Sequence, residues 1–468
     1  MEQPLTYLQN LTQNDWLIAD NSHQFLVIAK QLYLELTEIL KQRDTPPKII
    51  LAEPESVKFL ASFLAACAAN CPVFLCNPDW GTQEWEQVFA LVQPDIIWGI
   101  DSITHLAPST QHSLPITQHS ALIMIPTGGS SGKIKFAIHT WETLTSSVQG
   151  FTEYFQLTQV NSFCVLPLYH VSGLMQFMRS FTTGGKLVIL LFKSLELSQP
   201  PTIQPTEFFL SLVPTQLQRL LQNAELTQWL AQFQTIMLGG APAWPELLEK
   251  ARFHNIKLAP TYGMTETASQ IATLKPDDFL QGKINSGQIL PHAQVTIRNQ
   301  QGEVLPPHQI GNITIQAKSL ALGYYPHPGK NQDYFHVDDL GYLDEQGYLN
   351  IIGRDSDKII TGGENVYPGE IEAAIRATQM IADVCVIGVP DKYWGQALTA
   401  IYIPLDANIS ILEIKTLLQD KLSKFKIPKY WICLDNLPRN AQGKVNRQAL
   451  QQIAADFLQN HREQATLK

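Results

Sequence analysis

The chain has 468 residues, of which 45% are hydrophobic and 16% are charged, and this balance excludes an intrinsically disordered protein. The length allows about two to four units of ordinary domain size. The formal net charge is −9, whereas nucleic acids and anionic membrane surfaces are bound by clustered lysine and arginine. We therefore expect no nucleic acid partner.

Neither the N-terminal region nor the most apolar segment has the pattern of a membrane-targeting sequence. The first lysine is Lys30, so no positively charged leader precedes an apolar stretch. The most apolar segment, 60–76, is interrupted by Ser62, Asn70 and Pro72 and is too short to span a bilayer. We expect a cytoplasmic protein without a membrane span.

The cysteines indicate neither a metal site nor a redox motif. They lack the paired C-x-x-C spacing of metal ligands, and their neighbours are apolar. Because free cysteine packs as a small hydrophobic side chain, we expect buried thiols at Cys67, Cys71, Cys76, Cys164, Cys385 and Cys433.

The first half of the chain alternates helix-like and strand-like segments, which is typical of a mostly parallel sheet with crossover helices. In chain order we predict a helix at 24–42, a strand at 48–51, a helix at 56–69, a strand at 73–75, a helix at 82–91, and further strands at 121–125, 162–166, 186–191 and 207–213. Short strands with glycine and proline turns at 295–325 predict a small β-subdomain.

The chain turns polar at 353–357, and a compact α/β pattern then begins afresh. This second pattern predicts a helix at 368–377, strands at 384–389 and 398–403, a helix at 412–423 and a strand at 429–434. We therefore expect an α/β protein with a large N-terminal domain at 1–353 and a small α+β domain at 354–468.

A glycine- and hydroxyl-rich motif directly follows the predicted strand at 121–125. It reads Thr127-Gly128-Gly129-Ser130-Ser131-Gly132-Lys133. Glycines let backbone N–H groups turn toward one anion, and the hydroxyls and ammonium add donors. The motif is not a Walker A loop, because only three residues separate Gly128 from Gly132 and Ile134 stands where Ser or Thr would bind magnesium. A phosphate-binding loop and a solvated turn both fit it.

Two further segments suit a nucleotide and its metal. Tyr262-Gly263-Met264-Thr265-Glu266 supplies an aromatic face, a tight turn, a hydroxyl for a phosphate and a carboxylate for a divalent cation. Upstream, Gly239-Gly240-Ala241-Pro242 follows an apolar run and fits a backbone-lined slot for a flat purine. The second segment by itself is also compatible with an ordinary turn at the end of a strand.

A predicted hairpin places Asp338 and Asp339 on one strand and Arg354 on the other. A ribose diol needs a carboxylate acceptor, but Asp339 and Arg354 would also suit an ordinary surface ion pair. Near the C-terminus, Lys444 ends a glycine-containing turn where a lone lysine would ordinarily be a solvated charge.

In this order and at these spacings, the motifs resemble the adenylate-forming superfamily of acyl-CoA synthetases, peptide-synthetase adenylation domains and luciferases. The resemblance covers nearly the whole chain and implies a large N-terminal domain of stacked sheets with a small mobile C-terminal domain, using ATP, Mg²⁺ and coenzyme A. For the nucleotide, it implies a pyrophosphate loop at Thr127 to Lys133, an adenine site at Gly239, Gly240, Ala241, Pro242 and Tyr262, and a ribose clamp of Asp339 and Arg354. For the chemistry, it implies a glycine bordering the substrate at Gly263, an α-phosphate contact at Thr265, a magnesium ligand at Glu266 and a catalytic lysine at Lys444.

The chain departs from the superfamily pattern in three motifs, at four positions. Ile134 and Phe136 replace the usual proline and glycine of the loop, which affects only its fine geometry. Asp338 replaces the glycine that usually precedes the ribose-site aspartate, and its role is unassigned. Ser356 replaces the usual aspartate or lysine hinge, which leaves the pivot residue unassigned.

Within the superfamily, the segment from Pro167 to Gly173, which contains His170, together with Arg179 most resembles the 2-succinylbenzoate–CoA ligase family. An aromatic acid with a second carboxylate would pair with Arg179 in the acyl pocket, although Arg179 on a helix surface is the alternative. His170 would lie near the activated carboxylate, and Gly362 and Gly363 resemble the loop that admits the pantetheine arm of CoA.

We therefore expect an AMP-forming ligase whose partners are an aromatic carboxylic acid, ATP and CoA. Another aryl- or acyl-CoA ligase, a peptide-synthetase domain, and a catalytically silent nucleotide-binding protein of this fold remain alternatives. The sequence leaves open whether the chain forms a homo-oligomer.

Overall fold

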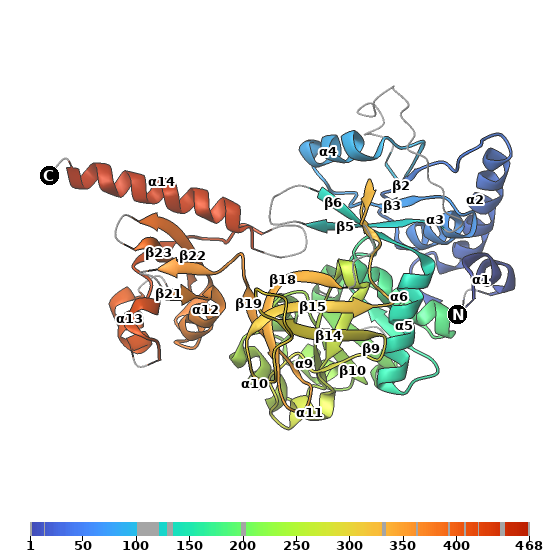
Figure 1. Cartoon of the computed structure of the whole chain (residues 1–468). Coiled ribbons are helices and arrows are strands. Elements are labelled where there is room, and N and C mark those ends of the chain that lie inside the picture. Colours follow the sequence, from blue (N-terminus) through green and yellow to red (C-terminus); the bar gives the residue numbers. More distant parts are fainter. Residues whose placement is uncertain are drawn as a thin grey trace. The chain divides into compact units, whose positions relative to one another are not determined.

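The computed structural model describes residues 2–13, 15–100, 121–128, 134–197, 203–329, 334–361, 364–391, 394–406, 409–419, 421–439 and 445–466 (Figure 1). The chain forms two compact units. The larger unit comprises Met1–Gly240, His254–Val295 and Ile315–Phe335, and the smaller unit comprises Ala241–Phe253, Thr296–Thr314 and His336–Lys468. Within the described ranges, no helix combines the length and the apolar character needed to cross a membrane.

An eight-stranded sheet with the order β1-β8-β7-β9-β10-β11-β12-β13 belongs to the larger unit. The strands from β1 to β11 pair in parallel, and β12 and β13 are added antiparallel at one edge. Their bounds are β1 Leu17–Ile18, β7 Asn161–Cys164, β8 Leu187–Ile189, β9 Phe208–Leu212, β10 Thr235–Leu238, β11 Leu258–Met264, β12 Ser269–Thr273 and β13 Gln288–Ile289. The carboxyl ends of the parallel strands therefore meet at one edge of the sheet.

Helices cover both faces of this sheet. On one face, Phe151 of α5 (Trp141–Phe155) contacts Phe209 of β9, with ring centroids 5.2 Å apart. On the opposite face, Phe163 of β7 contacts Trp229 of α9 (Ala224–Leu230) at 5.4 Å. Successive strand residues point to opposite faces, and because Phe209 pairs with Ser162, Phe163 must point away from Phe209.

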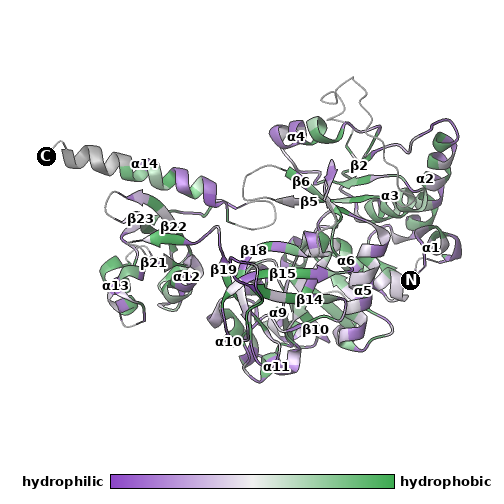
Figure 2. Cartoon of the chain, in the orientation of Figure 1, coloured by the Kyte–Doolittle hydropathy of each residue, from purple (hydrophilic) through white to green (hydrophobic). Residues whose placement is uncertain are grey.

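A second sheet of the larger unit has seven strands in the order β17-β16-β6-β5-β3-β2-β4. Their bounds are β2 Ile49–Leu51, β3 Val73–Leu75, β4 Ile96–Trp98, β5 Ile123–Gly128, β6 Ile134–His139, β16 Gly323–Tyr324 and β17 His327–Pro328. Alternate residues serve two cores: Ile49 and Leu51 pack in the same cluster as α3 (Ser56–Ala68), whereas Ile50 packs with α4 (Thr82–Val92). Figure 2 shows the hydrophobic colouring of α3, which buries 11 of its 13 residues.

The remaining helical segments of the larger unit connect or cover these sheets. They are α1 Pro4–Asn10, α2 Phe25–Leu40, α6 Val171–Thr183, α7 Phe192–Leu197, α8 Pro214–Leu220, α11 Pro276–Leu280 and the 3₁₀ turns η1 Ser22–Gln24, η3 Pro205–Glu207 and η4 Thr265–Thr267.

Two sheets provide the strands of the smaller unit. The first, mostly in this unit, has the order β14-β15-β18-β19, with bounds Ala293–Arg298, Gly311–Ala317, Phe335–Leu343 and Leu349–Arg354. The second contains β20 Ile359–Thr361, β21 Glu364–Val366, β22 Ile381–Asp391, β23 Gly395–Pro404 and β24 Tyr430–Cys433. The helical segments are α10 Pro245–Phe253, α12 Pro368–Arg376, α13 Ile411–Gln419, α14 Arg447–Thr466 and the turn η5 Lys424–Lys426.

Strand β22 shows why the C-terminal sheet is covered on both faces. Val384 and Val386 pack in one cluster with residues of α12 and α13. The intervening Cys385 and the following Ile387 pack in another cluster with Leu450 of α14. A strand that is buried on both faces has a continuous run of apolar residues, and this run is why β22 could be predicted from the sequence.

The predicted α/β class with mostly parallel sheets is confirmed, and every helix and strand predicted from the sequence is present with small shifts of its ends. The strands predicted at 295–325 divide between two sheets, because β14 and β15 join β18 whereas β16 pairs with β6. The expected domain boundary after Gly353 stays a prediction. The prediction of buried thiols is wrong for Cys433, which is exposed because β24 lies at a sheet edge and pairs with β23 alone.

Candidate functional site

The parallel strands β7, β9, β10 and β11 deliver most of the predicted site residues of the larger unit. Strand β7 ends just before the segment that contains His170, and β10 ends just before Gly239. Strand β11 ends within the motif that starts at Tyr262. Because these strands are parallel neighbours, their carboxyl ends share one edge. In open α/β sheets, ligands bind at this edge.

The predicted adenine segment makes a close backbone approach at this edge. Leu238 pairs with Pro260, so Gly239 lies beside Thr261, the residue before Tyr262. A Cβ at Gly239 would come within 2.5 Å of the Thr261 Oγ1 atom, and Gly240 adopts a left-handed φ of +83°. Side chains larger than glycine are therefore disfavoured here, as a slot for a flat ring requires. Ala241 and Pro242 follow and belong to the smaller unit.

Gly263 is held between two strands with no room for a side chain. It pairs with Gln270 of β12, and an added Cβ would lie 2.2 Å from the carbonyl oxygen of Ser269. Any larger residue here would push β11 and β12 apart, and the substrate-bordering role of Gly263 stays a prediction.

The turn η4, which carries Thr265 and Glu266, is fixed by hydrogen bonds from the seven-stranded sheet. His139 of β6 contacts the carbonyl oxygen of Thr265 at 2.8 Å through Nε2. The Tyr324 hydroxyl donates to Glu266 Oε1 at 2.5 Å, and the N–H of Ala321 donates to the Glu266 carbonyl oxygen at 2.8 Å. Burial and Glu266 together raise the pKa of Tyr324 well above its ordinary value, so its hydroxyl stays a donor.

His139 is neutral at physiological pH. It is fully buried, and burial lowers its pKa to about 4. A carbonyl oxygen only accepts hydrogen bonds, so Nε2 must carry the single ring proton and Nδ1 faces Thr143 Oγ1 at 3.0 Å as an acceptor. This tautomer holds the backbone of Thr265 in place.

Arg179 of α6 is buried, with 4% of its surface exposed, which makes the helix-surface alternative wrong. Its Nη2 donates to Gln270 Oε1 at 2.7 Å and to Ser269 Oγ at 3.2 Å, and its guanidinium carbon lies 4.4 Å from the centroid of the Phe151 ring. Burial lowers the pKa of Arg179 to about 9. The side chain is therefore still a cation at neutral pH, and within the described chain no carboxylate forms an ion pair with it.

The surroundings of Arg179 are rich in unused donors. Among the described residues, Arg179 Nε, Gln270 Nε2 and both ring nitrogens of His292 are buried without a hydrogen-bond partner. Burial, with a smaller contribution from the charge of Arg179, lowers the pKa of His292 to about 4. Arg179 Nε, Gln270 Nε2 and one nitrogen of the neutral His292 ring are donors, and the other ring nitrogen is an acceptor. Buried donors normally have partners, and a group of them around one cation fits an anionic ligand.

His170 lies at the N-terminal end of the helix that carries Arg179. It is the residue immediately before α6, and its ring contacts that of Tyr169 with centroids 4.5 Å apart. Nine helical positions separate it from Arg179, which corresponds to about 13 Å of helix rise. His170 lies at the N-terminal end of α6 and Arg179 lies in its C-terminal half. That the two side chains mark opposite ends of one pocket stays a prediction.

The predicted pair of Asp339 and Arg354 forms within the smaller unit, and its role as a ribose clamp stays a prediction. Asp339 of β18 and Arg354 of β19 are directly paired, with Nε and Oδ1 3.5 Å apart. The side chain of Asp339 is 14% exposed and that of Arg354 is 49% exposed. Asp338, whose role the sequence left open, accepts hydrogen bonds from the N–H of Ser356 at 3.2 Å and from its hydroxyl. Asp338 and Ser356, which both depart from the superfamily pattern, thus contact each other.

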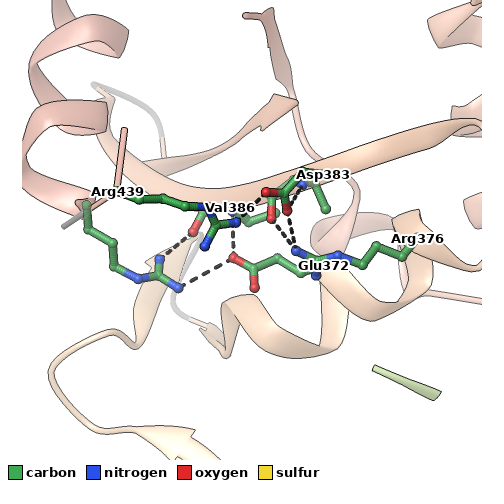
Figure 3. Close-up of polar contacts among 7 residues, drawn as sticks. Glu372, Arg376, Asp383, Val386 and Arg439 are labelled. Carbon is green, nitrogen blue, oxygen red and sulfur yellow. Dashed lines mark hydrogen bonds and ion pairs between the residues drawn. The ribbon is translucent and has the colours of Figure 1, made fainter. Parts of the chain in front are cut away.

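Several predicted residues lie outside the described residues, namely Gly129, Ser130, Ser131, Gly132, Lys133, Gly362, Gly363 and Lys444. The residues flanking 440–444 are described: Arg439 and Val445 form an antiparallel bridge. Figure 3 shows Arg376 and Arg439 directed at the carboxylate of Asp383, with Arg376 at 3.0 Å. Asp383 thereby attaches Arg439 to the C-terminal sheet.

Metal binding at this site would depend on one carboxylate. No cluster of three or more His, Cys, Asp or Glu suited to a metal occurs among the described residues. Glu266 forms no ion pair with a described lysine or arginine. Mg²⁺ is commonly held by one or two carboxylates together with substrate phosphates and water, so Glu266 fits the magnesium of an ATP complex.

Sequence reasoning missed His139, Tyr324 and Gln270. His139 stands out as the one polar residue that ends the apolar run Phe136-Ala137-Ile138, and this signal was available. Tyr324 gave no local signal, because its partner Glu266 precedes it by 58 positions.

Two family models match the chain. The model described as AMP-binding enzyme matches residues 98–325, and the model of the AMP-binding enzyme C-terminal domain matches residues 370–444. The second match includes the position of Lys444. The resemblance inferred from the motifs is confirmed.

Curated relatives and solved structures agree with this match. The chain is 33% identical to 2-succinylbenzoate–CoA ligase of Geobacillus sp. (strain WCH70), with 70% of this chain and 68% of that protein covered. It is 35% identical to the protein of the same name from Oceanobacillus iheyensis, with the same shares covered. The structure of o-succinylbenzoate CoA synthetase from Bacillus subtilis in complex with its acyl-adenylate intermediate has a TM-score of 0.82 at 25% identity and covers 96% of this chain and 98% of that chain. The same enzyme in complex with ATP and magnesium ion has a TM-score of 0.81 at 25% identity and covers 96% of this chain and 99% of that chain.

The low pKa of His139 predicts a pH-dependent stability. An unfolded histidine binds a proton near pH 6.5, whereas folded His139 does so only near pH 4. Protons therefore favour the unfolded chain between these values, and stability falls as pH drops from 6.5 toward 4, by about 3 kcal/mol in total. Melting temperatures measured from pH 7 to 4.5 should fall less in His139→Gln than in the wild type. The exposed His23→Gln variant should follow the wild type, and parallel curves for all three proteins would contradict this assignment.

Proposed function

Because this chain belongs to the AMP-binding enzyme family, we propose that it is an ATP-dependent acid–CoA ligase whose acid substrate is 2-succinylbenzoate. In the first half-reaction, an oxygen of the succinyl carboxylate attacks the α-phosphorus of ATP, pyrophosphate leaves and the acyl-adenylate forms. In the second, the thiol of CoA attacks the acyl carbon, loses its proton and displaces AMP. The product, 2-succinylbenzoyl-CoA, is an intermediate of menaquinone and phylloquinone biosynthesis.

The buried cation Arg179 is the observation that supports this acid most strongly. A buried charge without an opposite charge is costly, and among the described residues Arg179 has only the neutral acceptors Gln270 and Ser269. The benzoate carboxylate of 2-succinylbenzoate would supply the missing charge while the succinyl carboxylate reacts. An aryl or fatty acid with one carboxylate would leave Arg179 as it is, which makes the alternative of another acyl-CoA ligase less favourable.

Gly239, Gly240 and Tyr262 lie at the carboxyl ends of parallel strands, whereas Asp339 lies on β18 of the smaller unit. Tyr262 with Gly239 and Gly240 would bind adenine, and the Asp339 carboxylate would accept from the ribose diol. Thr265 would contact the α-phosphate from a turn whose backbone His139 holds in place. Preorganised groups of this kind need no rearrangement when charge develops on the phosphoryl oxygens.

Bound to Glu266 and the phosphates, magnesium would offset the negative charge of the transferring group. Lys444 would add a positive charge to the same group, and the motif from Thr127 to Lys133 would hold the leaving pyrophosphate. His170 would lie near the activated carboxylate and the incoming thiol, and Gly362 and Gly363 would admit the pantetheine arm. The retention of Lys444, Glu266, Asp339 and Arg354 in one chain is unfavourable to a catalytically silent protein.

The first test is thioester formation by the wild-type chain. With ATP, Mg²⁺ and CoA, we expect 2-succinylbenzoate to be converted with a kcat/KM at least about tenfold above benzoate, 4-oxo-4-phenylbutanoate and medium-chain fatty acids, since only it can pair with Arg179. Chromatographic detection of each CoA thioester checks this. A fatty acid as the best substrate would refute the proposed acid, and no pyrophosphate release with any acid would refute the ligase.

Lys444→Ala should separate the two half-reactions. Charge builds up on the phosphoryl group only while the adenylate forms, so the variant should lose most pyrophosphate release from acid and ATP. With chemically prepared 2-succinylbenzoyl adenylate and CoA, thioester formation should remain within about threefold of the wild type. Equal loss in both assays would show that Lys444 does not act specifically in adenylation.

Arg179→Ala should affect the diacid and spare its monoacid analogue. Loss of a buried charge-assisted contact is worth about 1.5 to 3 kcal/mol, or roughly ten- to a hundred-fold in kcat/KM for 2-succinylbenzoate. The loss should be much smaller for 4-oxo-4-phenylbutanoate, which lacks the benzoate carboxylate. Arg219→Ala, which removes an exposed arginine of the same unit, is the matched control and should leave both values unchanged. Equal losses for the two acids would make Arg179 a structural residue.

A further inference from the structure

Two residues of the seven-stranded sheet point at the same turn. Strand β16 pairs antiparallel with β6, with Tyr324 opposite Ala137. Directly paired residues point to the same face, and so does every second residue along a strand. Tyr324 and His139 therefore share one face, while Tyr325 points to the other face and packs there against Phe74 at 4.9 Å.

On their shared face, His139 and Tyr324 bind different parts of η4, the first its main chain and the second a side chain. His139 contacts the main chain, at the carbonyl oxygen of Thr265. Tyr324 contacts a side chain, because its hydroxyl donates to the Oε1 atom of Glu266 at 2.5 Å. A second main-chain bond, from the Ala321 N–H to the Glu266 carbonyl oxygen, would remain if the Tyr324 hydroxyl were removed. The phenol is thus not required to attach the turn to the sheet.

The Tyr324 bond instead restricts the rotation of a carboxylate. A glutamate side chain has several rotatable bonds, so an unrestrained Glu266 would lose conformational entropy each time it bound a ligand. The phenol hydrogen bond uses one lone pair of Oε1 and leaves Oε2 to a second partner. No described lysine or arginine supplies that partner, and the nearby ammonium of Lys135 lies over the Tyr324 ring, 5.4 Å from its centroid.

We propose that Tyr324 is a positioning residue that presents the Glu266 carboxylate to the divalent cation of the bound nucleotide. The proposal rests on the proposed function only for the assignment of Glu266 as the metal ligand. Hydrogen bonds to metal-ligating carboxylates fix their orientation, and loss of such a partner typically costs ten- to a hundred-fold in metal affinity. Because Tyr324 is half-buried, we expect the lower end of this range.

The test compares Tyr324→Phe with Tyr325→Phe, two single-hydroxyl deletions at adjacent positions on opposite faces of the sheet. For each purified full chain, the dissociation constant of α,β-methylene ATP is measured with Mn²⁺ and without metal, and bound Mn²⁺ is followed by electron paramagnetic resonance. Tyr324→Phe should weaken binding of the Mn²⁺ complex about tenfold. Its affinity for the metal-free nucleotide and its melting temperature should match those of Tyr325→Phe and the wild type.

Glu266→Gln provides the reference for loss of the metal ligand and should weaken the Mn²⁺ complex at least as much as Tyr324→Phe. In turnover assays, Tyr324→Phe should require about tenfold more Mg²⁺ for half-maximal pyrophosphate release and retain kcat within about threefold at saturating Mg²⁺. Wild-type affinity of Tyr324→Phe for the Mn²⁺ complex would overturn the proposal. Failure of the proposed function would be seen separately, as no pyrophosphate release by the wild type with 2-succinylbenzoate while Mn²⁺ binding still differed between the variants.

Discussion

The hydrogen bond from Arg179 to Gln270 connects the acyl end of the site to its nucleotide end. Arg179 lies on α6, and Gln270 lies on β12 directly opposite Gly263. Any shift of the guanidinium would therefore be transmitted to β11, which carries Tyr262 and leads into the turn η4 with Glu266. The cation cannot move toward water, since it is packed over Phe151 and buried. In the proposed function, a charge fixed in this way would favour a substrate that brings its own second carboxylate.

The turn η4 is where the two sheets of the larger unit meet. It continues from β11 of the eight-stranded sheet and is held by β6 and β16 of the seven-stranded sheet. In the proposed function, one sheet would supply residues for the nucleotide, and the other fixes the turn that carries Thr265 and Glu266. This division accounts for the burial of His139, which has no predicted ligand contact, in a single tautomer next to that turn.

The local patterns of the chain were sufficient for the fold class and for most of the motif positions. Apolar runs such as 49–51 and 384–389 are buried on both faces and were found as strands. The motifs were found because glycines and polar residues follow strand ends, where parallel sheets bind ligands. The acceptors of Arg179 could not be predicted, because Ser269 and Gln270 are 90 and 91 positions away.

Contacts made between distant strands account for what the sequence left undetermined. Asp338 was an unexplained extra charge until β18 placed it against Ser356. The exposure of Cys433 depends on β24 being an edge strand, which its apolar neighbours do not indicate. In each case the deciding factor is strand order, and strand order depends on long-range pairing that short motifs do not encode.

The most direct measurement of the central claim is a crystal structure of this chain with 2-succinylbenzoyl adenylate bound. We predict the benzoate carboxylate within hydrogen-bonding distance of the Arg179 guanidinium, or joined to it through one water, with the adenylate phosphate near Thr265. A benzoate carboxylate directed to solvent, with Arg179 still bonded only to Gln270 and Ser269, would contradict the assignment of Arg179 to substrate selection.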